Sequence, residues 1–311
     1  MPPGDTSLPT RSFGRHPDRF SLIGLGGGHL SRSSVTDAEA EVVIKAAIDS
    51  GITFLDTAWD YGYGASETRY GRALRGRRDD VFLMTKVCAR DAKTARIQLE
   101  ESLQRLQVDH VDLWQLHEVN YDNDPEWIFE AGGAIEALLE AREQGKVRYI
   151  GFTGHKSPHI LRAMLDMNME WDSCQMPISP FDSSFRSFGR EILPLLNARG
   201  IACLGMKSLG GNGQFVGVGG VTAQQCRRYA LSQQISVLIC GMVNDGDLQQ
   251  DLEIARNFEP MPEAEQEQLL TAIRREATDG RHEYFKTTTY FDHEYHRSAH
   301  GYPEFAEIRN R

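Results

Sequence analysis

The stretch GITFLDTAWDYG (residues 51–62) carries the clearest structural signal in the chain. It begins as an apolar run that ends in Asp56, and Tyr61 follows five positions later. A carboxylate at the end of a buried segment is costly unless an opposite charge lies beside it. The stretch therefore predicts a buried strand that ends at Asp56, and it predicts a basic partner for this carboxylate elsewhere in the chain.

Seven further apolar runs share this character, and each is followed by a longer segment of helical period. The apolar runs occupy residues 20–26, 52–58, 81–87, 111–117, 147–154, 173–179, 202–208 and 236–242. The helical segments occupy residues 36–50, 66–75, 91–106, 125–144, 158–167, 189–199, 222–233 and 247–257. Near-continuous apolar runs are typical of parallel strands covered on both faces. Eight strands and eight helices predict an α/β fold, a (β/α)8 TIM barrel, although a doubly wound open sheet shares the rhythm.

Residues 260–311 break this rhythm. A segment of helical period at 263–277 comes first, and a tail with many aromatic and histidine residues follows from residue 282. The barrel, at about residues 20–258, is complete before this segment begins. We therefore expect residues 1–311 to form a single domain, with a C-terminal extension packed on the barrel.

Composition excludes several classes of partner. The 311 residues are 40% hydrophobic and 25% charged, as in an ordinary globular protein. The formal net charge is −10 and no long basic stripe occurs, so nucleic acid and anionic membranes are poor partners. No apolar run approaches the roughly 18 residues of a membrane span, and the N-terminus lacks the apolar core of a signal peptide. Five cysteines without a CxxC pair indicate a reduced compartment, so we expect a cytoplasmic protein.

Ionisable residues stand at the ends of three neighbouring strands. Asp56 and Tyr61 follow the second strand, Lys86 ends the third and His117 ends the fourth. These ends meet on the face of a barrel where function gathers, so Lys86 is the candidate partner of Asp56.

This arrangement suits proton delivery to a carbonyl as hydride arrives on its carbon. We expect the Lys86 ammonium to favour the phenolate and so to lower the pKa of Tyr61 from about 10. His117 would hold the carbonyl oxygen by hydrogen bonding. The alternative is a purely structural Asp–Lys pair beside an aromatic ring.

With these residues in place, the chain resembles the aldo-keto reductases. The resemblance rests on GITFLDTAWDYG, on SETRYGRAL (66–74), on the lysine of LMTKV, on VDLWQLH and on the CQ of SCQMPIS. It runs from about residue 15 to 258. It implies a (β/α)8 barrel, a nicotinamide cofactor and a catalytic tetrad in which Tyr61 is the general acid or base. By this resemblance the tetrad consists of Asp56, Tyr61, Lys86 and His117.

The resemblance implies that the cofactor binds without a Rossmann domain. The stretch GLGGGH (24–29) has His29 where the dinucleotide fingerprint needs a glycine. Cofactor phosphates are expected at the loops 207–213 and 241–247, after the seventh and eighth strands. The expected cofactor-binding residues are Gly27, Asp56, Thr153, Gln175, Met206, Lys207, Ser208, Leu209, Gly241, Asp247 and Asp251.

At the nicotinamide end, Gln175 and Thr153 would meet the carboxamide. Met206 takes the place of a ring-stacking tyrosine, and a thioether still packs on that face. The side-chain-free Gly154 stands where many members have an asparagine.

NADP is the family's usual cofactor, and NAD is the alternative. Asp247 and Asp251 stand where many members have an arginine and an asparagine. Two carboxylates repel a 2′-phosphate and suit the ribose hydroxyls of NAD, so we expect weak discrimination between the two cofactors. Arg256 and Lys207 are the cations that would compensate.

The sequence thus predicts an NAD(P)H-dependent oxidoreductase that reduces a small-molecule aldehyde or ketone to an alcohol. One alternative is a regulatory or sensor subunit that binds the cofactor and turns over slowly. Another is a metal-dependent barrel hydrolase, which lacks clustered ligands at the strand ends. The sequence leaves the physiological substrate and the oligomeric state open.

The tail offers two further candidate features. Its histidines at 293, 296 and 300 share one face of a helix, as metal ligands would, but a tail that is solvated or packed on the barrel is the simpler expectation and no metal is predicted. Aromatic and histidine residues expected to border the substrate pocket are Trp59, Tyr63, Trp127, His155, Phe285, Tyr290 and Phe291.

Overall fold

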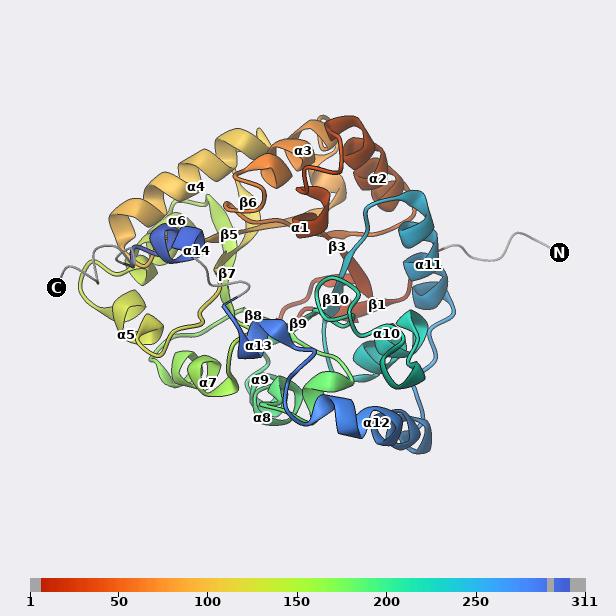
Figure 1. Cartoon of the computed structure of the whole chain (residues 1–311). Coiled ribbons are helices and arrows are strands. Elements are labelled where there is room, and N and C mark those ends of the chain that lie inside the picture. Colours follow the sequence, from red (N-terminus) through yellow and green to blue (C-terminus); the bar gives the residue numbers. More distant parts are fainter. Residues whose placement is uncertain (1–6, 290–293, 303–311) are drawn as a thin grey trace.

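The computed structural model describes residues 7–289 and 294–302, and its centre is a closed barrel of eight parallel strands (Figure 1). The strands pair in chain order, and β10 closes the ring by pairing with β3. Each strand lies within one of the eight predicted apolar runs, so the predicted TIM barrel is confirmed. The strands are β3 (Ile23–Gly26), β4 (Phe54–Asp56), β5 (Phe82–Val87), β6 (Val111–Leu116), β7 (Val147–Thr153), β8 (Ser173–Pro177), β9 (Ala202–Met206) and β10 (Val237–Gly241).

Helices form the outer ring, and their apolar faces pack against the strands. They are α2 (Asp37–Asp49), α3 (Ala65–Ala73), α4 (Ala92–Leu106), α5 (Asp124–Phe129), α6 (Ala134–Glu143), α7 (Pro158–Asp166), α8 (Phe188–Glu191), α9 (Leu193–Ala198), α10 (Ala223–Ser232) and α11 (Asp245–Arg256). A short helix, α1 (Gly27–Leu30), follows β3, and single 3-10 turns cover Arg78–Asp80, Phe181–Ser183 and Val218–Gly220.

Two segments predicted as single helices are each divided in two. The segment 125–144 breaks at Gly132, where φ is +81°. At the next residue, Gly133, a Cβ would lie 2.3 Å from the carbonyl oxygen of Ile128, so only glycine fits the turn. The segment 189–199 divides before Pro194, which has no N–H for the helical ladder.

A hairpin that the sequence did not reveal closes the amino-terminal end of the barrel. Strands β1 (Thr10–Ser12) and β2 (Arg19–Ser21) are antiparallel, and each has only three residues. Phe13, in the turn between them, is fully buried, and its ring lies 5.4 Å from that of Phe82 and 5.3 Å from that of Tyr149. The hairpin thus inserts an aromatic plug into the end of the barrel opposite Asp56.

The C-terminal segment packs on the barrel through α12 (Glu263–Ala277), α13 (Tyr284–Thr287) and α14 (Glu294–Ala299). Ile273 of α12 belongs to an apolar cluster with Phe181 and Phe215 of the loops after β8 and β9. The ring of Phe285 in α13 lies 6.0 Å from that of His155, which follows β7. These contacts favour the prediction of a C-terminal extension of the barrel domain.

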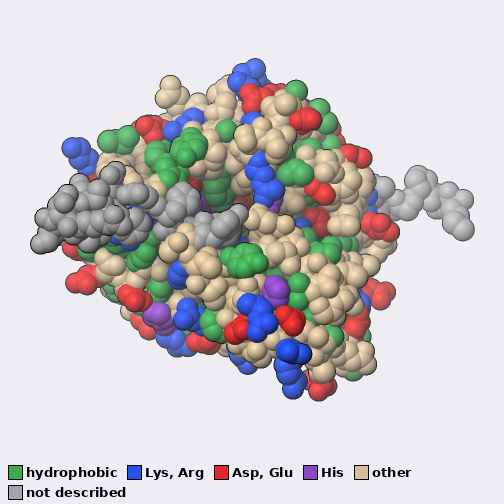
Figure 2. Space-filling model, viewed as in Figure 1, with side chains coloured by type: hydrophobic (Ala, Val, Ile, Leu, Met, Phe, Trp, Pro, Cys, Tyr) green, Lys and Arg blue, Asp and Glu red, His purple; other side chains and the backbone are tan. Residues whose placement is uncertain are grey.

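Charged side chains of both signs are interspersed around the rim of the face that carries α13 and α14 (Figure 2). Among residues 7–289 and 294–302, no helix combines the length and the apolar character that crossing a bilayer requires.

We expect Phe13→Ala to lower the free energy of unfolding by about 3–5 kcal/mol, because it empties a packed aromatic site. Chemical denaturation provides the measurement. Val42→Ala is the control, since Val42 is 67% exposed on α2 and should change stability by less than about 0.5 kcal/mol. A loss below about 1 kcal/mol for Phe13→Ala would show that the plug is dispensable.

Candidate active site

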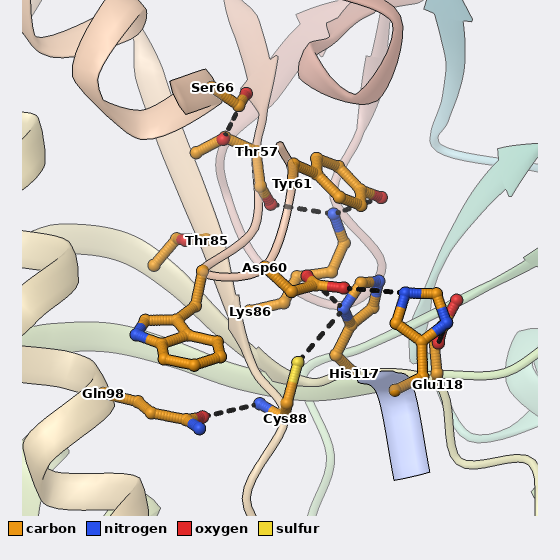
Figure 3. A network of polar contacts seen from close by, with 12 residues as sticks. Thr57, Asp60, Tyr61, Ser66, Thr85, Lys86, Cys88, Gln98, His117 and Glu118 are labelled. Atoms are coloured by element: carbon orange, nitrogen blue, oxygen red, sulfur yellow. Dashed lines mark hydrogen bonds and ion pairs between the residues drawn. The ribbon is translucent and has the colours of Figure 1, made fainter. Parts of the chain in front are cut away.

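The carboxyl ends of β4 and β5 bring Asp56, Lys86 and Tyr61 together. The ammonium of Lys86 contacts Oδ1 of Asp56. It also donates to the carbonyl oxygen of Thr57 at 2.8 Å and lies 3.3 Å from the Tyr61 hydroxyl (Figure 3). Asp56 and Lys86 are both buried. The predicted basic partner of Asp56 is therefore Lys86.

The loop after β4 places Tyr61 by hydrogen bonds to its surroundings. The hydroxyl of Thr57 contacts that of Ser66 at 2.7 Å, and the Trp59 amide donates to the carbonyl oxygen of Lys86. Gly62 and Gly64 both have positive φ, so the chain turns sharply after Tyr61 and enters α3.

The expected lowering of the pKa of Tyr61 is wrong for this structure. Burial, followed by the negative charges of Asp56, Asp60 and Glu118, raises its pKa well above the ordinary value of 10. The nearby ammonium does not outweigh these effects. Tyr61 is therefore protonated at neutral pH.

His117 follows β6, and its ring lies edge-on to Tyr61 with centroids 5.4 Å apart. Its Nδ1 is 2.9 Å from Oδ1 of Asp60 and 3.7 Å from Sγ of Cys88 (Figure 3). Within residues 7–289 and 294–302, Oδ1 of Asp60 has no well-aligned hydrogen-bond partner, so its contact with His117 is mainly electrostatic. Burial opposes ionisation of Asp60, but the charge and contact of His117, with smaller contributions from His296 and Lys86, lower its pKa to about 2.

The grouping of Asp60, Cys88 and His117 also bears on metal binding, because their ligand atoms lie within 4.8 Å of one another. Metal binding at Cys88 needs a thiolate. Burial and then the carboxylates of Asp60 and Glu118 raise the pKa of this thiol well above its ordinary value. Any metal binding at this group would therefore have to release the thiol proton of Cys88. His293, the first histidine of the tail series, lies outside the described residues, as do Tyr290 and Phe291.

A cavity of about 560 Å³ extends from Tyr61 and His117 towards the loops after β9 and β10. Gln175 borders it, and its Nε2 donates to Oδ2 of Asp56 at 2.8 Å, while its buried Oε1 has no hydrogen-bond partner among the described residues. An unpaired buried acceptor is rare and fits an amide N–H of a ligand. The predicted cofactor-binding residues that border the cavity are Asp56, Thr153, Gln175, Met206, Lys207, Ser208, Leu209, Gly241, Asp247 and Asp251.

Gly27, the other predicted cofactor-binding residue, is not among the residues that border the cavity. A Cβ there would lie 2.3 Å from Oγ of Ser66, so Gly27 packs against α3, and its neighbours Gly26 and Gly28 border the cavity. Gly154 likewise has no room for a side chain, since a Cβ would lie 2.6 Å from the carbonyl oxygen of Val119.

At the far end of the cavity, Asp251 is paired with a cation, but this cation is neither Arg256 nor Lys207. Arg227 on α10 holds both oxygens of Asp251 at 2.9 Å and donates to Oγ of Ser208 at 2.7 Å. The carboxylate of Asp247 accepts from the amide of Val243 at 3.0 Å. Carboxylate repulsion of a phosphate is therefore weaker here than the sequence suggested.

Of the two compensating cations that the sequence offered, only Lys207 borders the cavity. Arg256 lies at the carboxyl end of α11, whereas Asp247, near the amino end, borders the cavity. Burial lowers the pKa of Lys207 to about 8.

Most of the aromatic residues expected at the pocket lie elsewhere. Trp59 donates its Nε1 to Glu101, Trp127 stacks on Tyr302, and Tyr63 is 78% exposed. Phe285 is buried behind the cavity wall, and His155 is the member of the described set that borders the cavity.

Several residues of the site escaped the sequence reasoning. Asp60 directly precedes Tyr61 and Glu118 directly follows His117. Their position in the sequence beside tetrad residues could therefore have indicated that they belong to the site. Arg227 shares a helical face with Ala230 and Leu231, and an arginine on a buried face is a signal too. His296, which also borders the cavity, carried no signal of its position, because the tail follows no strand.

We expect Lys86→Met to lower the free energy of unfolding by about 3–5 kcal/mol, because it leaves Asp56 as a buried carboxylate without its cation. Thermal and chemical melts measure the effect. Lys146→Met is the matched control, since Lys146 pairs with Glu100 at the surface and should cost less than about 1 kcal/mol. Equal losses for the two variants would contradict the buried-pair argument.

Comparison with known proteins agrees with this geometry. Residues 22–227 match the model of the Aldo/keto reductase family. The aldo-keto reductase YhdN of Bacillus subtilis is 38% identical over 148 residues, which cover 42% of each chain. The aldo-keto reductase yakc [NADP(+)] of Schizosaccharomyces pombe is 31% identical over 202 residues, 60% of this chain and 54% of that protein. The matches thus span about half the length of these curated relatives.

Solved structures show the same fold. An aldo-keto reductase (AKR11C1) from Bacillus halodurans, a holo form, has a TM-score of 0.72 at 22% identity and covers 89% of this chain and 99% of its own. An aldo/keto reductase from Klebsiella pneumoniae, in complex with NADP and acetate, has a TM-score of 0.68 at 22% identity, covering 86% and 95%. With the family match over residues 22–227, the chain belongs to the aldo/keto reductase family.

Proposed function

We propose that the protein is an NAD(P)H-dependent oxidoreductase that reduces an aldehyde or ketone to an alcohol. One observation carries the proposal: the Tyr61 hydroxyl lies 3.3 Å from the ammonium of Lys86, which is itself paired with buried Asp56, at the inner end of a cavity. Buried ionisable residues that meet at the inner end of a cavity in this way are typical of a catalytic site.

In this proposal Tyr61 donates its proton to the carbonyl oxygen. The bound nicotinamide supplies the hydride. Because its pKa is raised, Tyr61 arrives at the reaction protonated, as a general acid must. Lys86 then stabilises the phenolate left behind, and Asp56 holds Lys86 in place. His117 turns Nδ1 to Asp60, which leaves Nε2 to hydrogen-bond the carbonyl oxygen.

We propose NADP as the cofactor, with NAD as the alternative. The S. pombe relative is named for NADP(+), and the K. pneumoniae structure contains NADP. The unpaired Oε1 of Gln175 suits the carboxamide of the nicotinamide, with Thr153 beside it and Met206 against the ring. The remaining contacts would come from the backbone around Gly27 and from further residues that line the cavity: Lys207, Ser208, Leu209, Gly241, Asp247 and Asp251.

We expect Tyr61→Phe to lower the rate of hydride transfer by about 10²–10⁴-fold, because only the proton-donating hydroxyl is lost. Single-turnover absorbance of NADPH with a panel of aldehydes and ketones measures the rate. Cofactor affinity should stay nearly unchanged, since the ring still fills its space. Tyr63→Phe is the control, as Tyr63 is exposed two positions away and should keep the wild-type rate.

A Tyr61→Phe variant that keeps more than about a tenth of the wild-type rate would show that another group is the acid. A wild-type protein that binds the cofactor and reduces no member of the panel would instead favour the sensor-subunit alternative.

We expect cofactor affinity to fall as pH rises above about 8. Burial lowers the pKa of Lys207 to about 8, and anionic phosphates beside it would favour its charged form. Below pH 8 the charge is already present, whereas above it binding must also take up a proton, so affinity falls by at most about tenfold per pH unit. Fluorescence quenching by NADPH between pH 6.5 and 9.5 gives the dissociation constants. Lys207→Gln should bind more weakly and without this slope, and a wild-type constant that is flat across pH 8 would remove Lys207 from the phosphate site.

A further inference from the structure

The C-terminal helix α14 carries His296 into the cavity that holds Tyr61 and His117. The imidazole, 15% exposed, lies between two carboxylates. Its Nε2 is 3.5 Å from Oδ2 of Asp60, and its Nδ1 is 3.5 Å from Oε2 of Glu118. The most C-terminal described helix thus reaches residues at the ends of β4 and β6.

Both carboxylates flank residues of the tetrad. Asp60 precedes Tyr61 and lies 2.9 Å from Nδ1 of His117. Glu118 follows His117, and its φ of +50° is a left-handed conformation that a glutamate adopts when its surroundings impose it. One carboxylate, that of Asp60, therefore contacts both the histidine of β6 and the histidine of the tail.

Electrostatics explains why a tail histidine belongs here. The side chains of Asp60 and Glu118 are 3% and 9% exposed, and buried carboxylates need positive or hydrogen-bonding partners. His117 faces one oxygen of Asp60, and His296 faces the other. Loss of either imidazole would leave the Asp60 side chain poorly fixed.

Residues before and after α14 bind to the barrel, and these contacts hold His296 in position. Before α14, the buried ammonium of Lys286 lies 2.7 Å from Oδ1 of Asp182. After α14, the hydroxyl of Tyr302 donates to Oδ1 of Asp124 at 2.9 Å, and its ring stacks on Trp127 at 4.7 Å.

We propose that His296 is a positioning residue of the active site, which acts on His117 through Asp60. It fixes Oδ2 of Asp60, so that Oδ1 stays against Nδ1 of His117 and Nε2 of that ring faces the substrate. The inference rests on the proposed carbonyl reduction, because His117 is the group through which His296 acts. The C-terminal extension is then part of the active site and not only packing.

A double-mutant cycle on the full chain tests this role. Single-turnover hydride transfer from NADPH is measured for His296→Leu, Asp60→Asn and the double variant, with a carbonyl that the wild type reduces. We expect His296→Leu to slow the reaction by about tenfold or more and to change the NADPH dissociation constant by less than about threefold. In the Asp60→Asn background, His296→Leu should change the rate by less than about twofold, because the carboxylate on which His296 acts is already absent.

Two further variants separate positioning from general damage to the tail. His296→Gln keeps an N–H donor for Asp60 and should recover to within about threefold of the wild-type rate. His159→Gln is the control, since His159 pairs with Asp122 at 2.6 Å on the exposed surface and should leave rate and melting temperature unchanged. Equal effects of His296→Leu in both backgrounds overturn the proposal. So does a folded His296→Leu variant with the wild-type rate, or a His296→Gln variant as slow as His296→Leu.

A readout independent of turnover distinguishes this inference from the proposed function. Nuclear magnetic resonance of the histidine ring nitrogens, with His117 assigned from His117→Gln, should show a changed His117 signal in His296→Leu and an unchanged one in His159→Gln. If the wild-type protein reduces no carbonyl but the His117 signal changes in His296→Leu, the proposed function is refuted, while the coupling of His296 to His117 through Asp60 is supported. If the enzyme is active but the His117 signal is the same in the wild type and in His296→Leu, the inference is overturned.

Discussion

The buried ion pair of Asp56 and Lys86 is the constraint on which the rest of the site depends. One ammonium contacts the carboxylate that ends β4, the carbonyl oxygen of Thr57 and the hydroxyl of Tyr61, while Gln175 from β8 donates to the other oxygen of the same carboxylate. Strands from opposite sides of the barrel are thus joined through a single charge pair. Because a buried ion pair adds little net stability compared with apolar packing, its presence at the barrel mouth is better explained by what it does to Tyr61.

Backbone strain gathers around this pair. Among the described residues, five non-glycine residues have positive φ, and Tyr63, Glu118 and Lys207 are three of them. Each follows the carboxyl end of a barrel strand, at β4, β6 and β9. Strain of this kind persists where surrounding contacts over-determine the backbone, and it is concentrated at ligand sites. The barrel supplies that rigidity, and the loops after β4, β6 and β9 carry these three strained residues.

The sequence predicted the barrel because parallel strands covered on both faces must be apolar along their whole length. It did not predict the N-terminal hairpin, because strands of three residues are too short for a periodicity to show. Gly132 and Pro194 are residue types that interrupt helices. The helical period of apolar residues continues on either side of each, however, so the sequence predicted unbroken helices. Long periodic elements are readable from one sequence, whereas short elements that depend on tertiary contacts are not.

The same distinction applies to the site. Asp56, Tyr61, Lys86 and His117 were predictable, since strand ends place them on one face. The direction of the pKa shift of Tyr61 was not, because it depends on burial and on the carboxylates of Asp60 and Glu118. His296 was beyond prediction for a further reason, since its position depends on the path of a tail that belongs to no repeat.

At the far end of the cavity, the number of acidic residues in the sequence is a poor guide to how strongly a phosphate is repelled. Asp251 counted as a carboxylate that would repel a phosphate, yet Arg227 holds both of its oxygens, so the pair is neutral as a unit. Asp247 has its carboxylate at the amino end of α11, where the helix dipole already favours negative charge. What remains to distinguish a ribose hydroxyl from a phosphate is the Ser208 hydroxyl beside Arg227, together with Arg32 and Lys207 on the cavity wall. For the proposed cofactor, the choice between NADP and NAD would therefore depend on how those donors are arranged and not on the excess of acidic residues in the sequence.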